Sequence, residues 1–196
     1  MFRALIVTIG IVAAPQFSHA SCDIPNEDIS LLKAAEAKFR NMPTIETADE
    51  FFNLLPDQFC KFNQIYGWID DAPAPLYEPP LFQSLANLAE FKPANELAMK
   101  YVGLASEAKW FPDNISALQS AYHELFLRET DIVVENINRL PTDEAEIAVR
   151  FLFDGPHPTA SFLDPQDKRI ACQISAPFCM LLNSSEEQLS AEEDAQ

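Results

Sequence analysis

The stretch that decides the fold is residues 113–140, DNISALQSAYHELFLRETDIVVENINRL. Its apolar side chains recur every three or four residues, which is the spacing of one face of an α-helix. These residues are Ile115, Leu118, Tyr122, Leu125, Phe126, Val133, Ile137 and Leu140. Leu127 and Val134 fall away from that face, and a helix that is apolar on two sides is usually central to its fold. The stretch therefore predicts a long central helix.

The other apolar residues also recur with helical spacing, in shorter runs separated by prolines. These runs are residues 28–41, 47–55, 57–66, 81–90, 94–109, 142–153 and a segment that starts at Asp164–Pro165. Thr47 and Glu50 have the spacing of a capping box, in which a hydroxyl and a carboxylate satisfy free amides at a helix start. No run alternates with the period of two that a strand requires. The prediction is an all-α fold of packed αα-hairpins around the central helix.

An aromatic residue followed three positions later by Asp recurs at three predicted helix ends. The pairs are Trp68 and Asp71, Trp110 and Asp113, and Phe151 and Asp154. The two intervals between the aspartates are nearly equal (113 − 71 = 42 and 154 − 113 = 41). This period suits a solenoid of helical pairs, in which an aromatic residue fills each junction and Asp caps the following turn. Chance recurrence among ordinary αα-hairpins is the alternative.

Residues 1–20 have the features of a secretory signal peptide. Arg3 supplies the positive charge, a short apolar run follows, and residues 18–20 place small side chains where a signal peptidase reads them. The apolar run is too short for a stable membrane anchor, so we expect a periplasmic or secreted protein. Acylation of Cys22 as a lipoprotein is the less favoured alternative, because His19 stands where that signal normally has a branched apolar residue.

All 4 cysteines lie after the proposed cleavage site, at Cys22, Cys60, Cys172 and Cys179. An even number of cysteines in an exported chain indicates two disulfides, for which three pairings exist. We favour Cys22–Cys60 and Cys172–Cys179, because each pair is closest in sequence. The spacing lacks the short paired intervals of a zinc site, and we expect neither a metal nor a cofactor.

The chain is strongly acidic. Its formal net charge of −17 becomes −18 (−17 − 1) once Arg3 leaves with the signal peptide. Such a surface repels nucleic acid and anionic lipids and attracts a basic protein or a cation, although acidity also simply keeps an exported protein soluble. Residues 183–196 hold five acidic residues and no basic one. They predict a disordered acidic tail after a single helical domain at residues 21–182.

The most unusual local stretch is residues 151–158, FLFDGPHP, which contains Asp154 and His157. Gly155 allows a sharp turn and two prolines stiffen the segment. Rigid presentation of a carboxylate and an imidazole suits a general acid/base pair or half of a metal site. The interpretation that we favour is ordinary turn chemistry, in which Asp154 accepts backbone amides and His157 packs nearby.

The predicted central helix carries two further titratable groups of interest. His123 precedes Glu124, but no second histidine follows at four residues, so the zinc-protease signature is missing. Glu129 lies among apolar positions, where a buried carboxylate would have a raised pKa; we expect it either to be paired, with Arg150 of the next helix as one candidate, or to mark the point where the helix emerges from the core. Neither position predicts an active site.

Trp68, Asp70 and Asp71 come directly before a proline-rich segment that leads to Tyr77. The prolines between residues 71 and 80 predict a loop. An acidic, aromatic and stiff loop suits the binding of a cation, a sugar or an arginine of a partner protein. An ordered connector is the alternative.

Four strings in the middle of the chain carry a resemblance. They are Leu55-Pro-x-x-Phe59-x-x-Phe62-x-x-x-Tyr66-Gly-Trp68, Pro75-Leu-Tyr77, Trp110-x-x-Asp113 and Phe151-Leu-Phe-Asp-Gly-Pro-His-Pro158. In these strings the chain resembles small exported bacterial helical proteins of unassigned function. In general character, as an acidic, helical and disulfide-linked periplasmic protein, it also resembles immunity proteins that neutralise toxins. That second likeness rests on no shared motif and implies no residue roles.

These observations favour a non-enzymatic exported binding protein, whose acidic loops bind a basic effector as an inhibitor or immunity protein would. The expected contact residues are Trp68, Asp70, Asp71, Tyr77, Trp110, Asp113, Asp154 and His157. One alternative is a periplasmic hydrolase that uses Asp154 and His157, with or without a metal. A structural component of the cell envelope is another. The sequence contains no nucleophile elbow and no phosphate-binding glycine loop that would strengthen the enzyme hypothesis.

Overall fold

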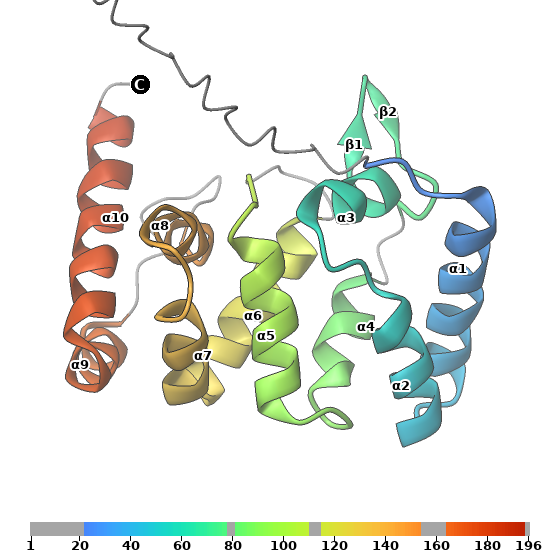
Figure 1. Cartoon of the computed structure of the whole chain (residues 1–196), viewed down its shortest axis with the longest axis horizontal. Coiled ribbons are helices and arrows are strands. Elements are labelled where there is room, and N and C mark those ends of the chain that lie inside the picture. Colours follow the sequence, from blue (N-terminus) through green and yellow to red (C-terminus); the bar gives the residue numbers. More distant parts are fainter. Residues whose placement is uncertain (1–21, 78–80, 110–114, 154–163, 195–196) are drawn as a thin grey trace, which may run out of the picture.

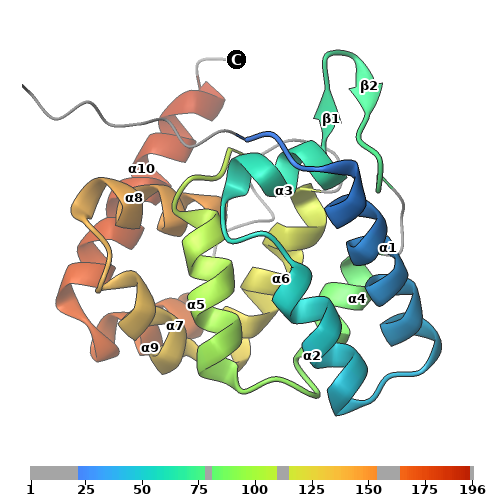
Figure 2. The same ribbon diagram turned by 45° about the vertical axis from the view of Figure 1, so that its right-hand side comes forward.

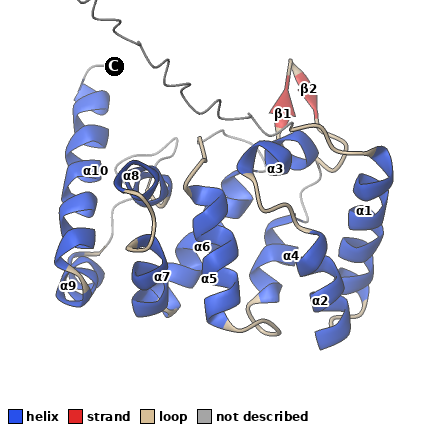
Figure 3. Cartoon of the chain, viewed as in Figure 1, coloured by secondary structure: helices blue, strands red, loops and turns tan. Residues whose placement is uncertain are grey.

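The computed structural model of the protein describes residues 22–77, 81–109, 115–153 and 164–194. Within these ranges the chain is all-α as predicted, and its one β element is a small antiparallel hairpin (Figures 1 and 3). The elements are α1 (Asn26–Asn41), α2 (Ile45–Leu54), α3 (Phe59–Tyr66), β1 (Trp68–Ile69), β2 (Ala72–Pro73), α4 (Leu81–Leu88), α5 (Ala94–Ala105), α6 (Ile115–Arg128), α7 (Thr130–Ile137), α8 (Thr142–Phe151), α9 (Pro165–Ile174) and α10 (Ala176–Asp194).

The helices form a row in which several adjacent helices pack together and several pairs of second-next helices also pack together. Helix α4 contacts α6, α5 contacts α7, α7 contacts α9, and α8 contacts α10. Helix α1 lies at one end of the row and α10 at the other (Figures 1 and 2). Stacked αα-hairpins have this contact pattern, because each pair buries its apolar face only against its neighbours. The predicted packing of helical hairpins is therefore confirmed.

The sequence intervals between the starts of stacked helices are not constant. The interval from the start of α4 to the start of α6 equals that from α8 to α10 (115 − 81 = 34 and 176 − 142 = 34). The interval from α6 to α8 is shorter (142 − 115 = 27). None of these intervals equals the spacing of the aspartates that suggested a repeat. Two of those three aspartates, Asp113 and Asp154, lie outside the described residues.

The predicted central helix is wrong in one respect, because the stretch forms two helices. Helix α6 ends at Arg128 and α7 begins at Thr130, with Glu129 between them in a non-helical conformation (φ −131°, ψ 50°). Both helices pack against α5, but α6 also packs against α4 and α7 also packs against α9. The break therefore lets Val134 enter the core while Leu127, at the end of α6, stays 47% exposed.

The prediction of a disordered tail is wrong for residues 183–194, which belong to α10. Four residues of this helix are buried at successive intervals of four, three and four: Phe178, Leu182, Ser185 and Leu189. They form one helical face, and α10 packs against α8 and α9. The helical domain consequently extends past residue 182, because a periodic apolar stripe outweighs the acidic composition around it.

An ion pair links the far end of α10 to α8, and its basic residue is Arg150. The Arg150 guanidinium donates to both carboxylate oxygens of Glu192, at 3.0 and 2.7 Å. Arg150 is therefore not the partner of Glu129; the Glu129 carboxylate is paired as expected, but with its neighbour Arg128, whose Nε lies 3.3 Å away. Bidentate geometry makes the Arg150–Glu192 pair a specific link between α8 and α10.

Both favoured disulfides are present. Cys22 bonds to Cys60 and thereby ties the N-terminal segment to α3, and Cys172 bonds to Cys179 across the junction of α9 and α10. The first bond occupies the thiol that lipid attachment at Cys22 would need. The predicted signal peptide lies outside the described residues. In the part of the chain that is described, no helix has the length and apolar character to cross a membrane.

The start of α2 differs from the predicted capping box. Thr44 is the cap: its Oγ1 accepts the Thr47 amide at 3.3 Å, and the Thr44 amide donates to Thr47 Oγ1 at 3.0 Å. Thr47 is thus the third residue of the helix rather than its cap. Glu50, the predicted carboxylate of the box, pairs with Lys38 of α1 instead. This exchange of roles moves the helix start and links α2 to α1.

A buried carboxylate joins three helices on the α1 side of the core. Glu36 of α1 accepts hydrogen bonds from Ser84 of α4 at 3.0 Å and from the Tyr66 hydroxyl of α3 at 3.4 Å. Arg40 lies 3.9 Å from the same carboxylate. A buried charge is tolerated only when it is paired and hydrogen-bonded, so this network fixes the relative positions of α1, α3 and α4.

Two buried tyrosines differ in whether the hydroxyl has a hydrogen-bond partner, so removing that hydroxyl should change the stability of the protein differently at the two positions. Tyr101 donates to the Leu85 carbonyl at 3.0 Å, whereas the Tyr122 hydroxyl has no partner among the described residues. We expect Tyr101→Phe to lower the free energy of unfolding by about 1 kcal/mol, and Tyr122→Phe to leave it unchanged or raise it by about 1 kcal/mol. Urea denaturation of both variants measures this. A larger loss for Tyr122→Phe than for Tyr101→Phe would contradict the assignment.

The same burial predicts sensitivity to alkaline pH. Burial raises the pKa of Tyr66, Tyr101 and Tyr122 above the ordinary value of 10.0. The unfolded chain therefore loses these protons first, so stability is full below pH 10 and falls as the pH rises further. Each such tyrosine contributes a slope of about 1.4 kcal/mol per pH unit. Denaturation curves across this range should show a shallower loss for Tyr122→Phe than for the parent protein, and equal slopes would refute the prediction.

Candidate partner-binding site

The hairpin between α3 and α4 projects away from the row of helices (Figures 1 and 2). Trp68 pairs with Pro73 and Ile69 with Ala72, which leaves a two-residue turn at Asp70 and Asp71. Both aspartates have positive φ, 48° and 64°. Two left-handed residues match the right-handed twist of a hairpin, and Asp tolerates this conformation better than most residues. The hairpin therefore presents two exposed carboxylates at its tip.

The return strand is anchored to α3 by backbone hydrogen bonds. The Ala74 amide donates to the Gly67 carbonyl at 3.0 Å, and the Leu76 amide donates to the Ile65 carbonyl at 2.9 Å. The side chains of Ala74 and Leu76 are buried. A projecting tip thus stands on a fixed base, which limits the conformational entropy that binding would cost.

Two aromatic rings flank this base. The rings of Trp68 and Tyr77 meet edge to face, with centroids 5.4 Å apart and an interplanar angle of 76°. Trp68 nevertheless keeps 49% of its surface exposed. A large aromatic side chain that is held by a neighbour and still half exposed is typical of the anchors at protein–protein interfaces.

The structure brings together half of the predicted contact residues. Trp68, Asp70, Asp71 and Tyr77 share the hairpin and its base. The other predicted contact residues lie outside the described ranges: Trp110, Asp113, Asp154 and His157. The Asp154–His157 pair of the hydrolase hypothesis is among them.

His123 packs against an aromatic ring in the described part of the chain. His123 of α6 meets the Phe153 ring edge to face at 6.2 Å. Burial lowers its pKa, with Glu124 and Asp167 opposing that shift. No group of three or more His, Cys, Asp or Glu side chains in the described ranges is arranged to hold a metal ion.

Intramolecular ion pairs determine which charges are available to a partner. At least eight of the 13 Lys and Arg side chains pair with carboxylates of the protein itself. Lys92, for example, lies 2.7 Å from Asp49 and 2.8 Å from Glu96. In the described part of the chain, Asp70 and Asp71 have no such partner. The hairpin tip therefore carries uncompensated negative charge.

Sequence reasoning identified these residues but assigned them to a loop. The signal for a hairpin was weak, because Asp-Asp is less typical of a two-residue turn than Asn-Gly or Asp-Gly. The Trp68–Tyr77 contact had no signal in the sequence, since it depends on the return of the chain after the turn. Comparison with known proteins adds no assignment: protein-family models, curated proteins and solved structures give no match to this chain.

The junction between α3 and the hairpin requires glycine. A Cβ atom at Gly67 would lie 2.8 Å from the backbone oxygen of Asn63 and even closer to its side chain. We expect Gly67→Ala to destabilise the protein by about 1–3 kcal/mol, because the end of α3 must shift. The matched control is Gly103→Ala in α5, where nothing lies within 4 Å of the added atom and stability should rise by about 0.5–1 kcal/mol. Thermal denaturation compares the two, and a harmless Gly67→Ala would overturn this account of the junction.

Proposed function

We propose that this is an exported, non-enzymatic binding protein that captures and neutralises a basic protein in the periplasm or outside the cell. The observation that carries the proposal is the projecting hairpin, which combines two uncompensated carboxylates with a half-exposed, supported tryptophan. As an acidic, helical and disulfide-linked chain, the protein is similar in general character to immunity proteins.

The aromatic base supplies the contact energy in this proposal. Residues that dominate binding are enriched in Trp and Tyr, which bury a large area at little conformational cost. Trp68 is already restrained by Tyr77, so little of its freedom remains to be lost on binding. The anchored return strand has the same effect on the backbone.

The acidic tip supplies the charge complementarity. A protein with a formal net charge of −17 attracts a basic partner over long range and accelerates encounter. Asp70 and Asp71 at the tip then favour a lysine or arginine of the partner over an acidic surface. The two disulfides fit a location outside the reducing cytoplasm.

No observation on the described residues favours a second function. A hydrolase would need Asp154 and His157 to converge with another carboxylate, and no contact among the described residues favours it. A structural envelope role likewise has no specific observation behind it.

The proposal predicts that the hairpin governs capture of a basic partner. The mature chain, used as bait against an envelope extract of its source, should retain a basic protein at low salt and less of it at moderate salt. Trp68→Ala should weaken binding of that protein by roughly tenfold or more, and Asp70→Asn with Asp71→Asn should chiefly slow association. Surface plasmon resonance with the purified partner separates the two effects.

The charge control is the pair Glu146→Gln and Glu187→Gln, which removes the same number of charges from exposed positions of α8 and α10, far from the hairpin (Figure 1). If the control pair slows association as much as the hairpin pair, the contact is not at the tip. A partner that binds Trp68→Ala with undiminished affinity would rule out the hairpin as its site.

A further inference from the structure

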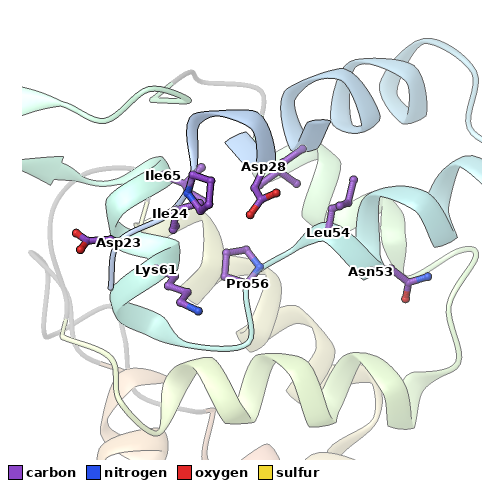
Figure 4. A pocket seen from close by; sticks show the side chains of 10 residues that line it. Asp23, Ile24, Asp28, Asn53, Leu54, Pro56, Lys61 and Ile65 are labelled. Atoms are coloured by element: carbon purple, nitrogen blue, oxygen red, sulfur yellow. The ribbon is translucent and has the colours of Figure 1, made fainter. Parts of the chain in front are cut away.

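A hollow lies beside α3, on the side of the N-terminal segment, and no residue of the hairpin lines it (Figure 4). Its volume is about 320 Å³, within the roughly 300–1,000 Å³ typical of ligand sites. Its walls come from the N-terminal segment, α1, the end of α2 and α3. Four separate segments therefore enclose a space of the size of a small ligand.

The inner surface of the hollow is apolar and well ordered by the core. Leu32 of α1 and Ile65 of α3 line it and are almost fully buried. Ile24, Leu54 and Pro56 complete the apolar lining. The Cys22–Cys60 disulfide holds the segment that carries Ile24 against α3, so the site is formed before any ligand arrives.

Two opposite charges line the same space. Asp28, in the first turn of α1, and Lys61 of α3 lie on either side of Pro56 in Figure 4. Neither has a hydrogen bond or an ion pair with another described residue. Asp23 also lines the hollow, but it already takes part in an interaction of its own. Asp28 and Lys61 are thus the two charges available to a ligand.

We propose that the hollow binds a short apolar peptide in its zwitterionic form. The peptide's terminal ammonium group donates to the Asp28 carboxylate, its terminal carboxylate accepts from the Lys61 ammonium, and its side chains lie against Ile24, Leu54 and Pro56. A simple cation would meet Lys61, and a simple anion would meet Asp28. A ligand with both charges on an apolar body satisfies both charges and the apolar lining together.

A titration with the dipeptide leucyl-leucine tests this directly. Chemical shifts of the ¹⁵N-labelled mature protein should move at Ile24, Asp28, Lys61 and Ile65. Acetylating the peptide's amine or amidating its carboxylate should each weaken binding by roughly tenfold, because each change removes one charged hydrogen bond.

Two variants assign the charges to residues. Asp28→Asn should abolish the preference for the free amine over the acetylated peptide and keep the preference for the free carboxylate. Lys61→Gln should do the reverse. Glu27→Gln, at an exposed position of the same helical turn, should bind like the parent protein. Unfolding curves confirm that each variant is folded.

The outcomes are decisive in both directions. Binding with this reciprocal loss of preference supports the proposal. No shift at the four positions, equal affinity for the blocked peptides, or binding that follows only one of the two charges would overturn it. The experiment involves neither the hairpin nor a basic protein, so its failure would leave the proposed function untouched.

Discussion

Helix α6 must bury apolar side chains on more than one side, and the arrangement of the row follows from this constraint. Ala117, Leu118 and Phe126 are all buried and lie at different positions around the helix, and α6 contacts α4, α5 and α7. No single neighbour can cover such a helix, so elements from before and after it in the chain must stack around it. Helices farther from the centre have less to bury. Only Ala171 of α9 is fully buried, and the position of α9 depends on the adjacent disulfide as well as on packing.

The sequence predicted the ends of helices correctly where a proline or glycine follows the apolar periodicity. It failed where a helix ends because of its packing against other helices. Gly67 ends α3 as expected, and Asp164 caps α9 by accepting a hydrogen bond from the Gln166 amide. At Glu129 neither proline nor glycine marks the break, which separates a helix that also packs against α4 from one that also packs against α9. At the C-terminus, composition was given more weight than spacing. Phe178 and the buried residues that follow it on the same face of α10 show that the helical spacing is the better predictor there.

The candidate site was predictable in its residues and not in its shape. Trp68, Asp70 and Asp71 stand out because acidic and aromatic residues adjoin a proline-rich segment. Their projection from the surface depends on two positive φ angles, which the Asp-Asp dipeptide permits without specifying them. No pattern in the sequence predicted the hollow beside α3. Its walls come from four separate segments, and residues such as Ile24 and Lys61 look like ordinary core and solvent positions until those segments meet.

The ion pairs of this protein matter more for its electrostatic surface than for its stability. Exposed pairs contribute only about 0–1 kcal/mol each, and the acidic residues outnumber the basic ones 30 to 13. Lys92 and Lys100 show where the basic groups are used. Both lie over the Phe52 ring, at 4.8 and 5.1 Å from its centre; Lys92 binds Asp49 of α2, and Lys100 binds Asp57 in the segment between α2 and α3. Basic groups that are held inside the row in this way cannot neutralise the hairpin. Asp70 and Asp71 at the hairpin tip therefore have no ion-pair partner among the described residues, and a basic group on the proposed partner would supply the complementary charge.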